Sequence, residues 1–135
     1  MIVDKVPMMS SSDKPSKLKV SDLLMQAIAD AGVSAVFGIA GGASLHLLNS
    51  VVTHPKLTLI TTHHEQAAAM AADSYSRVSG NLGVAIATSG PGATNLITGI
   101  SGCFYDSVPT VFITGQVSTT RQSGTTGTRH IGFQE

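Results

Sequence analysis

The sequence predicts an α/β domain of three layers, in which helices cover both faces of a mainly parallel sheet. Short apolar, β-branched runs alternate with longer helical patterns along the chain, which is typical of strand–helix–strand units with right-handed crossovers. Glycine or proline separates most of these runs, as expected where a chain turns. The length of 135 residues suits one such domain with its own apolar core.

Capping and breaking residues mark two helices in the first half of the chain. Ser21 is expected to cap a helix that Gly32 ends in the left-handed conformation. Gly41 and Gly42 are expected to open a second helix, and Pro55 interrupts the chain after it. The core-facing residues of the two helices are expected to be Leu23, Leu24, Ala27, Ile28 and Ala31, and then Leu45, Leu48, Val51 and Val52. After each helix comes a short apolar run that predicts a strand, at 33–37 and at 57–61.

The second half repeats this alternation. A helix is expected over 65–79 with Gly80 beyond its end, and a buried strand over 82–87 follows. A further helix over 93–106 and a strand over 110–114 complete the pattern.

Both ends of the chain depart from the pattern. Residues 1–16 are polar around a proline and predict a flexible tail, so the domain itself is expected to occupy 17–135. Residues 118–132 predict a long polar loop, and no further strand or helix follows before Glu135. A doubly wound domain is expected to add one, so we expect the domain to be incomplete at its C-terminus.

Composition excludes several classes of partner. Eight basic and eight acidic residues balance, so charge favours neither nucleic acid nor an anionic membrane. The apolar runs are too short for a membrane span, and the first residues lack the apolar core of a signal peptide. Cys103 is the only cysteine, which fits a reducing cytoplasm rather than a disulfide framework. Charged residues are only 12% of the chain, so we expect other domains or subunits to bury part of its surface.

Three segments are predicted to meet at one edge of the sheet. The strand ends are followed by 38–42, by His63-His64-Glu65 and by 89–95, and ligands bind beyond the carboxyl ends of strands in open α/β sheets. Segment 89–95 (Ser-Gly-Pro-Gly-Ala-Thr-Asn) joins a strand to a helix, where glycines allow close backbone approach and helix N–H groups face a ligand. A tight strand-to-helix turn would explain the same glycines, so spacing alone leaves both interpretations open.

Glu65 is the carboxylate at this edge. An acidic residue at a helix N-terminus can simply complement the helix dipole. The helix that follows Glu65 is rich in alanine, however, and can pack very closely against its neighbours. A carboxylate at the tip of such a helix is expected to lose water, which suits a group that shares a proton.

The remaining candidates are assigned to structure. His63 and His64 are adjacent and face opposite ways, so one metal cannot easily hold both, and at least one is expected to serve hydrogen bonding. Cys103 is expected in the core, and Gly99 and Gly102 are expected to mark close helix packing.

Together these motifs resemble the acetolactate synthase family of thiamine-diphosphate enzymes. The segments that carry the resemblance keep the family's order, at 36–43, 64–68, 89–95, 106–109, 113–117 and 133–135. Segment 89–95 is the most distinctive of them, and the match covers about Leu18 to Glu135. The resemblance implies the amino-terminal, pyrimidine-binding domain of such an enzyme.

The resemblance also implies a role for each site residue. In the family a glutamate shares a proton with N1′ of the cofactor's aminopyrimidine, and this catalytic role falls to Glu65. The matching cofactor-binding residues are Gly41, Gly42, Glu65, Pro91, Asn95 and Gln116, and those on the substrate side are Phe133 and Gln134. The family holds the diphosphate and Mg²⁺ in a separate domain through a Gly-Asp-Gly motif, which does not occur in this chain, so no metal ligand is expected here.

The implied activity is carboligation or decarboxylation of a 2-oxo acid such as pyruvate, by a cytoplasmic homodimer or tetramer. Ile39 and Ala40 stand where the family usually has Tyr-Pro, and Ser118 where it has Pro, which leaves the substrate pair open. The alternatives are a decarboxylase or lyase with another substrate, a non-catalytic remnant, and a regulatory or interaction module that reuses the fold. Glu65 favours the enzyme, since a remnant has no physical need for a carboxylate there. The fragment alone is expected to be inactive.

Overall fold

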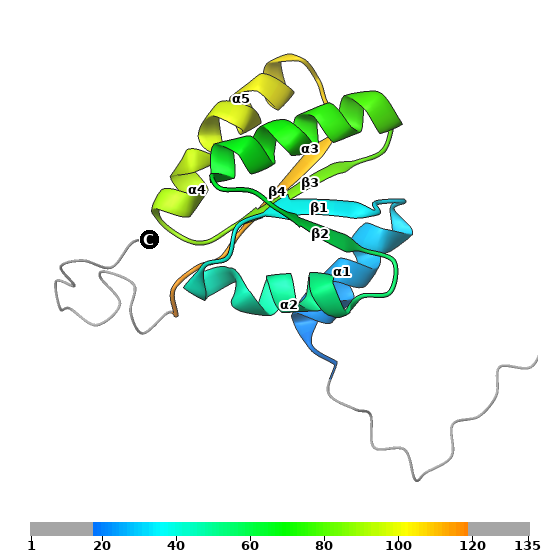
Figure 1. Ribbon diagram of the computed structural model, residues 1–135, viewed down its shortest axis with the longest axis vertical. Helices are drawn as coiled ribbons and strands as arrows, with labels where there is room; N and C mark the ends of the chain where they lie inside the picture. Colours follow the sequence, from blue (N-terminus) through cyan, green and yellow to red (C-terminus); the bar gives the residue numbers. More distant parts are fainter. Residues whose placement is uncertain (1–17, 119–135) are drawn as a thin grey trace, which may run out of the picture.

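The computed structural model describes residues 18–118, in which four parallel strands lie between two layers of helices (Figure 1). The elements are, in order, α1 (Val20–Asp30), β1 (Ala35–Gly38), the 3₁₀ helix η1 (Gly42–Ser44), α2 (Leu45–Thr53), β2 (Thr58–Thr61), α3 (Glu65–Ser79), β3 (Gly83–Ala87), α4 (Pro91–Asn95), α5 (Ile97–Tyr105) and β4 (Thr110–Thr114). The predicted three-layer α/β class with a parallel sheet is confirmed. The predicted tail at 1–16 and the loop at 119–132 lie outside the described residues.

The strand order β2-β1-β3-β4 creates a switch point between β1 and β3. From β1 the chain runs through α2 to β2 on one side, and it then crosses through α3 to β3 on the other side. Phe37 pairs with Ala85 and Gly38 pairs with Ile86 across the two central strands. The carboxyl ends of β1 and β3 therefore border the place where the direction of the crossovers reverses, which is where open α/β sheets bind ligands.

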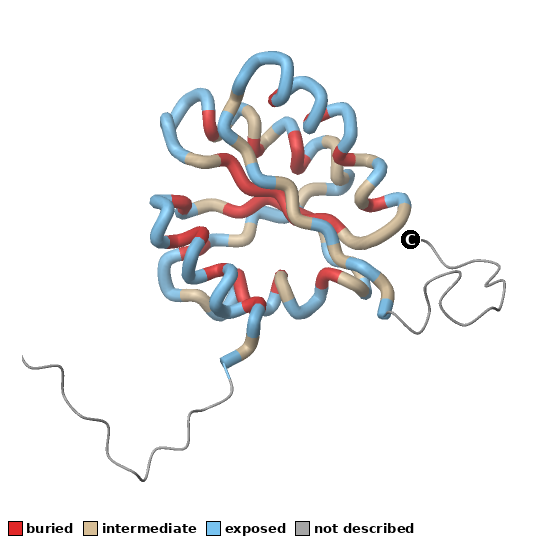
Figure 2. The backbone as a smooth tube through the Cα atoms, turned by 180° about the vertical axis from the view of Figure 1, so that it is seen from behind, coloured by how far each residue is buried: buried red, intermediate tan, exposed pale blue. Residues whose placement is uncertain are grey.

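Two apolar clusters hold the layers together. Helices α1 and α2 cover one face of the sheet, and α3, α4 and α5 cover the other (Figure 1). The first cluster includes the fully buried Met25, Val36 and Val51, and the second is built from alanines of α3 and β3 with Phe37 and Leu96. Every residue of β3 is buried, and Figure 2 shows that burial is most continuous along the central strands.

Helix α3 packs so closely against β3 and α5 that the contacting positions on these elements have no room for a side chain. A Cβ on Gly83 would lie 2.1 Å from the carbonyl oxygen of Ala72, and a Cβ on Gly99 would lie 2.3 Å from the Cβ of Ala69. The close packing predicted for the alanine-rich helix and for Gly99 is confirmed. The same prediction was wrong for Gly102, where an added Cβ would meet nothing within 4 Å.

The core-facing side of α1 differs from the prediction. Ile28 is buried as predicted and Met25 is buried with it, whereas the other four predicted residues are exposed: Leu23 (50%), Leu24 (38%), Ala27 and Ala31. Ser21 does not cap the helix but lies inside its first turn, where its hydroxyl accepts a 2.9 Å hydrogen bond from Ser50 of α2. This buried polar contact determines which face of α1 packs against α2. The spacing of apolar residues in the sequence gives no sign of it.

Two later helices also depart from expectation. In α2, Leu48 and Val51 are buried as predicted, but Leu45 and Val52 are exposed. The helix predicted over 93–106 is divided into α4 and α5 at the buried Leu96. The Leu96 N–H donates to Ala93, three residues back, in a tight turn that interrupts regular α-helical bonding.

An exposed apolar stripe runs along α5. Ile97, Ile100 and Phe104 are spaced three and four residues apart and are 58%, 38% and 78% exposed. Cys103, on the same helix, is buried as predicted. Within residues 18–118, no helix combines the length and the apolar character that crossing a membrane requires.

Candidate functional site

Segments that follow β1, β2 and β3 converge at the switch point, as predicted from the strand ends. Glu65 is the first residue of α3 and lies beside Gly92 of α4, because a Cβ on Gly92 would lie 3.2 Å from Glu65 Oε1. The Glu65 side chain is half-buried, so the strong loss of water expected for it is only partly seen. The close packing that the alanines produce occurs further along α3, at Ala69 and Ala72.

Asn95 holds the Glu65 carboxylate from the opposite end of α4. Its side-chain Nδ2 donates a hydrogen bond of 2.9 Å to Glu65 Oε2, in a partly buried position. A hydrogen bond to an ionised acceptor is stronger than one between neutral groups, so this contact fixes the direction of the carboxylate. The bond engages Oε2, while Oε1 lies on the side of Gly92.

Thr88, the residue after β3, links these groups to the loop that follows β1. A Cβ on Gly41 would lie 2.4 Å from Thr88 Cβ, and a Cβ on Gly92 would lie 2.8 Å from Thr88 Cγ2. Thr88 Oγ1 also accepts a hydrogen bond of 3.2 Å from the backbone N–H of Ala43. Gly41, Thr88, Gly92 and Glu65 thus form one continuous set of contacts across the switch point.

The other residues predicted for the site differ in how they relate to the contacts around Glu65. An added Cβ on Gly42 would meet nothing within 4 Å, so the backbone there borders open space. Pro91 is exposed at the first turn of α4. Gln116 follows β4, is exposed, and accepts a hydrogen bond from the N–H of Val117, with no contact to Glu65 among the described residues. Phe133 and Gln134 lie outside the described residues.

His64 has the hydrogen-bonding role expected for one of the two adjacent histidines. It occupies the N-cap of α3, where its Nδ1 accepts from the N–H of Gln66 at 3.1 Å. The Thr62 hydroxyl donates to the backbone carbonyl of His64 at 2.8 Å. These bonds fix the start of α3 and therefore the place from which Glu65 projects. In residues 18–118 no group of three or more potential metal-binding side chains occurs.

The sequence did not single out Thr88 or the contact of Gly92 with Glu65. Thr88 stands directly after a buried strand, which is the one local sign that it could face a site. Its partners, Ala43 and Gly41, come from a segment more than forty positions earlier, at a separation of 45 for Ala43. Only the fold brings them together.

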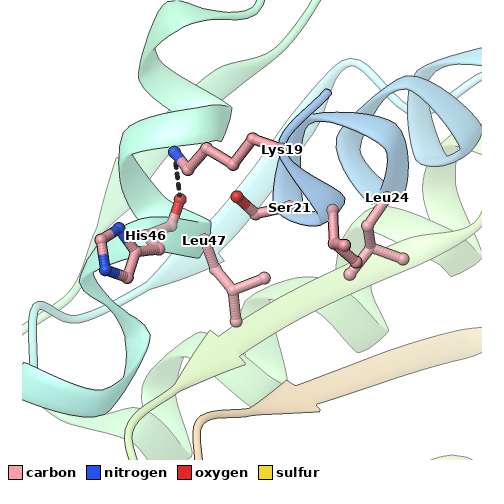
Figure 3. A pocket seen from close by; sticks show the side chains of 6 residues that line it. Lys19, Ser21, Leu24, His46 and Leu47 are labelled. Atoms are coloured by element: carbon pink, nitrogen blue, oxygen red, sulfur yellow. Dashed lines mark hydrogen bonds between the residues drawn. The ribbon is translucent and has the colours of Figure 1, made fainter. Parts of the chain in front are cut away.

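A separate hollow lies between the first turns of α1 and α2 (Figure 3). It has a volume of about 540 Å³ and an almost wholly apolar lining, to which Val20, Leu24 and Leu47 contribute. Lys19 Nζ closes one side by donating to the carbonyl of His46 at 3.3 Å. The carboxylate and the converging glycines are absent from this hollow, so the switch point is the better candidate for chemistry.

Comparison with known proteins identifies the family to which the chain belongs. Residues 18–135 match the family described as thiamine pyrophosphate enzyme, N-terminal TPP binding domain. The chain belongs to this family. Its α/β fold with a parallel sheet is the fold of the class that the resemblance implied.

Within that class the chain is similar to acetolactate synthases. It is 48% identical over 99 residues to acetolactate synthase 1, chloroplastic, of Oryza sativa, which covers 73% of this chain and 15% of the relative. It is 46% identical over 101 residues to the acetolactate synthase large subunit of Haemophilus influenzae, covering 75% of this chain and 18% of the relative. It is also 46% identical over 102 residues to a probable acetolactate synthase large subunit of Methanocaldococcus jannaschii, covering 76% and 17%. The chain is thus a TPP-binding N-terminal domain of the acetolactate synthase-like type, and it spans less than a fifth of the length of these relatives.

Proposed function

We propose that this domain activates thiamine diphosphate for a carboligase or decarboxylase that acts on a 2-oxo acid, as in an acetolactate synthase. The observation that carries the proposal is the Glu65 carboxylate at the switch point, held through Oε2 by Asn95. A carboxylate fixed in this way can present its other oxygen to a nitrogen of an aminopyrimidine. When bound, the cofactor supplies a nucleophilic carbon and an electron sink for the cleavage and formation of carbon–carbon bonds.

The residues around Glu65 fit the aminopyrimidine ring. Gly41 and Gly92 both pack directly against Thr88, where a Cβ on either would collide, so the two backbone segments lie close together beside the carboxylate. Gly42 faces open space beside them. A flat heteroaromatic ring can lie against open backbone of this kind, and a pocket for it needs a few placed polar groups to fix its orientation. Glu65 provides that polar group.

Glu65 would act by holding and returning a proton at the ring nitrogen N1′. A general acid–base group must lie within hydrogen-bond reach of the atom with which it exchanges a proton. Asn95 contributes by keeping the carboxylate in one orientation, and the His64 cap contributes by fixing the helix start. Pro91 and Gln116 are proposed to border the cofactor, and Phe133 and Gln134 to face the second substrate.

The remaining assignments rest on the resemblance to the acetolactate synthase family. The diphosphate and Mg²⁺ are proposed to be held by a part of the enzyme other than this chain, in a cytoplasmic homodimer or tetramer. The substrate is proposed to be pyruvate or a similar 2-oxo acid. A decarboxylase or lyase acting on another 2-oxo acid remains the alternative, because Ile39 and Ala40 lie in the loop beside Gly41 and differ from the usual residues of the family.

The experiment is an assay of the complete gene product that carries this domain, supplied with pyruvate, thiamine diphosphate and Mg²⁺. We expect acetolactate to form only when the cofactor is present. Formation of carbon dioxide and an aldehyde without acetolactate would favour the decarboxylase. Absence of cofactor binding by the complete, folded protein would contradict the proposal.

A further inference from the structure

We propose that Thr88 is a positioning residue that holds the glycine loop at 41–43 in register with the Glu65 carboxylate. Thr88 lies at the centre of the contacts described above: its side chain touches the positions of Gly41 and Gly92, and Gly92 in turn touches Glu65. Its hydroxyl accepts the hydrogen bond from the N–H of Ala43. The inference rests on the proposed function, since it takes the glycine loop to line the cofactor site.

The shape of Thr88 makes it suited to this role. Threonine is branched at Cβ and has few χ1 rotamers, so its Cβ, methyl and hydroxyl occupy fixed places. The Cβ fills the place that a side chain on Gly41 would need, and the methyl fills the place that one on Gly92 would need. Thr88 therefore sets the spacing between two backbone segments that have no side chains of their own.

The hydroxyl of Thr88 also orients the glycine loop, through its hydrogen bond with Ala43. Ala43 lies in η1, directly after the glycines, and its N–H is bound by Thr88. The carbonyl of Ala43 is in close contact with Gly115 after β4, because a Cβ on Gly115 would lie 2.3 Å from that oxygen. The loop is thus fixed on one side by the hydrogen bond that Ala43 donates to Thr88, just after β3, and on the other by packing against Gly115, just after β4.

The first test measures amide hydrogen exchange, resolved by residue, in the full 135-residue chain. Thr88→Val keeps the branched shape and removes the acceptor, so the Ala43 amide should exchange about fivefold faster, as expected for loss of one hydrogen bond. Thr88→Ser keeps the hydroxyl, so the Ala43 amide should exchange at nearly the parent rate. The side-chain amide signal of Asn95, which reports its bond to Glu65, should be unchanged in both variants.

A second pair of variants covers the case in which Thr88→Val does not fold. Gly41→Ala places a Cβ against Thr88 and should release the Ala43 amide, whereas Gly42→Ala enters open space and should not. An Ala43 amide that exchanges at the parent rate in Thr88→Val, or in Gly41→Ala where Thr88→Val cannot be folded, overturns the proposal. So does a general rise in exchange that includes the Asn95 signal, since that would make Thr88 a folding residue only.

The second test measures thiamine diphosphate binding and turnover in the complete gene product. Thr88→Val should weaken binding of the cofactor while kcat at saturating cofactor stays close to the parent value, because Glu65 and Asn95 are not disturbed. Thr88→Ser keeps the hydroxyl, so it should bind the cofactor more tightly than Thr88→Val. Unchanged affinity together with a released Ala43 amide would overturn the link to the cofactor. Failure of the parent protein to bind thiamine diphosphate would instead overturn the proposed function, and the exchange experiment would still decide whether Thr88 holds the loop.

Discussion

Asn95 and Glu65 are thirty positions apart in the sequence, and the Asn95 side-chain amide donates a 2.9 Å hydrogen bond to Glu65 Oε2. The amide donates without adding charge beside the carboxylate. The bond joins the last residue of α4 to the first residue of α3. The direction of the carboxylate therefore depends on how these two helices pack.

Glu65→Gln should nearly abolish turnover while leaving the fold intact. The glutamine amide oxygen can still accept from Asn95, so the local packing survives, but an amide cannot exchange a proton with N1′. We expect the rate of C2 proton exchange of bound thiamine diphosphate, measured by NMR in the complete gene product, to fall roughly 10²- to 10⁴-fold.

Asp73→Asn is the matched control for this change. It makes the same acid-to-amide substitution on the same helix, where Asp73 pairs with Arg77 at 2.7 Å on the surface. C2 exchange should stay near the parent rate, since exposed ion pairs contribute little to stability. A Glu65→Gln protein that exchanges the C2 proton as fast as the Asp73→Asn control would rule out the assignment of Glu65.

Asn95→Ala should slow the reaction without preventing it. The loss of a hydrogen bond to a charged group costs about 1.5–3 kcal/mol, which corresponds to a decrease of roughly ten- to hundredfold in kcat. Steady-state kinetics with the cofactor at saturation measure the effect. Asn49→Ala, an identical substitution at an exposed position of α2, should leave kcat unchanged; equal losses in both variants would assign the effect to stability.

Gly99→Ala should destabilise the domain and Gly102→Ala should not, although both glycines lie in α5. An added Cβ at Gly99 would be forced against Ala69, and overpacking of this kind costs about 1–3 kcal/mol. At Gly102 the Cβ enters open space, and replacing a helical glycine with alanine contributes about 0.5–1 kcal/mol. Urea denaturation should show midpoints that move in opposite directions, and a common shift would contradict the packing described for α3 and α5.

The exposed stripe of Ile97, Ile100 and Phe104 should make the chain associate in solution. An apolar stripe of this kind on a helix that is charge-free over its whole length favours contact with another surface. Phe104→Ser should lower the mean mass seen by light scattering and the binding of a hydrophobic dye. Thr98→Ser on the same helix is the control; a parent chain that stays monomeric and binds no dye would show the stripe to be inert.

The sequence predicted best those elements whose limits are set by local chemistry. The helix over 65–79 and the strand over 110–114 have the predicted limits, because Gly80 adopts the left-handed conformation at the helix end and the strand is a short β-branched run. The convergence of Glu65 with the loops after β1 and β3 also followed from the rule for parallel sheets.

Other features depend on contacts between distant residues. The apolar pattern of α1 is nearly continuous, so only its contact with α2 at Ser21 and Ser50 determines that Met25 rather than Leu24 is buried. The role of Thr88 depends in the same way on a partner in another segment. The hydrogen bond between Asn95 and Glu65 could not be predicted either, because the division of the helix at Leu96 sets where Asn95 lies.

The parallel order of the strands has a consequence for folding kinetics. Neighbouring parallel strands cannot form a hairpin, so each pairing requires a crossover. The partner of β1 in β3 lies nearly fifty residues further along the chain. Loops of this length must close before native contacts can compensate for the lost entropy, so such topologies fold slowly. The Glu65 site draws on segments after three strands and therefore completes only once β3 is in place. The Asn95 side-chain signal should consequently appear late in refolding, after the helical signal of α3.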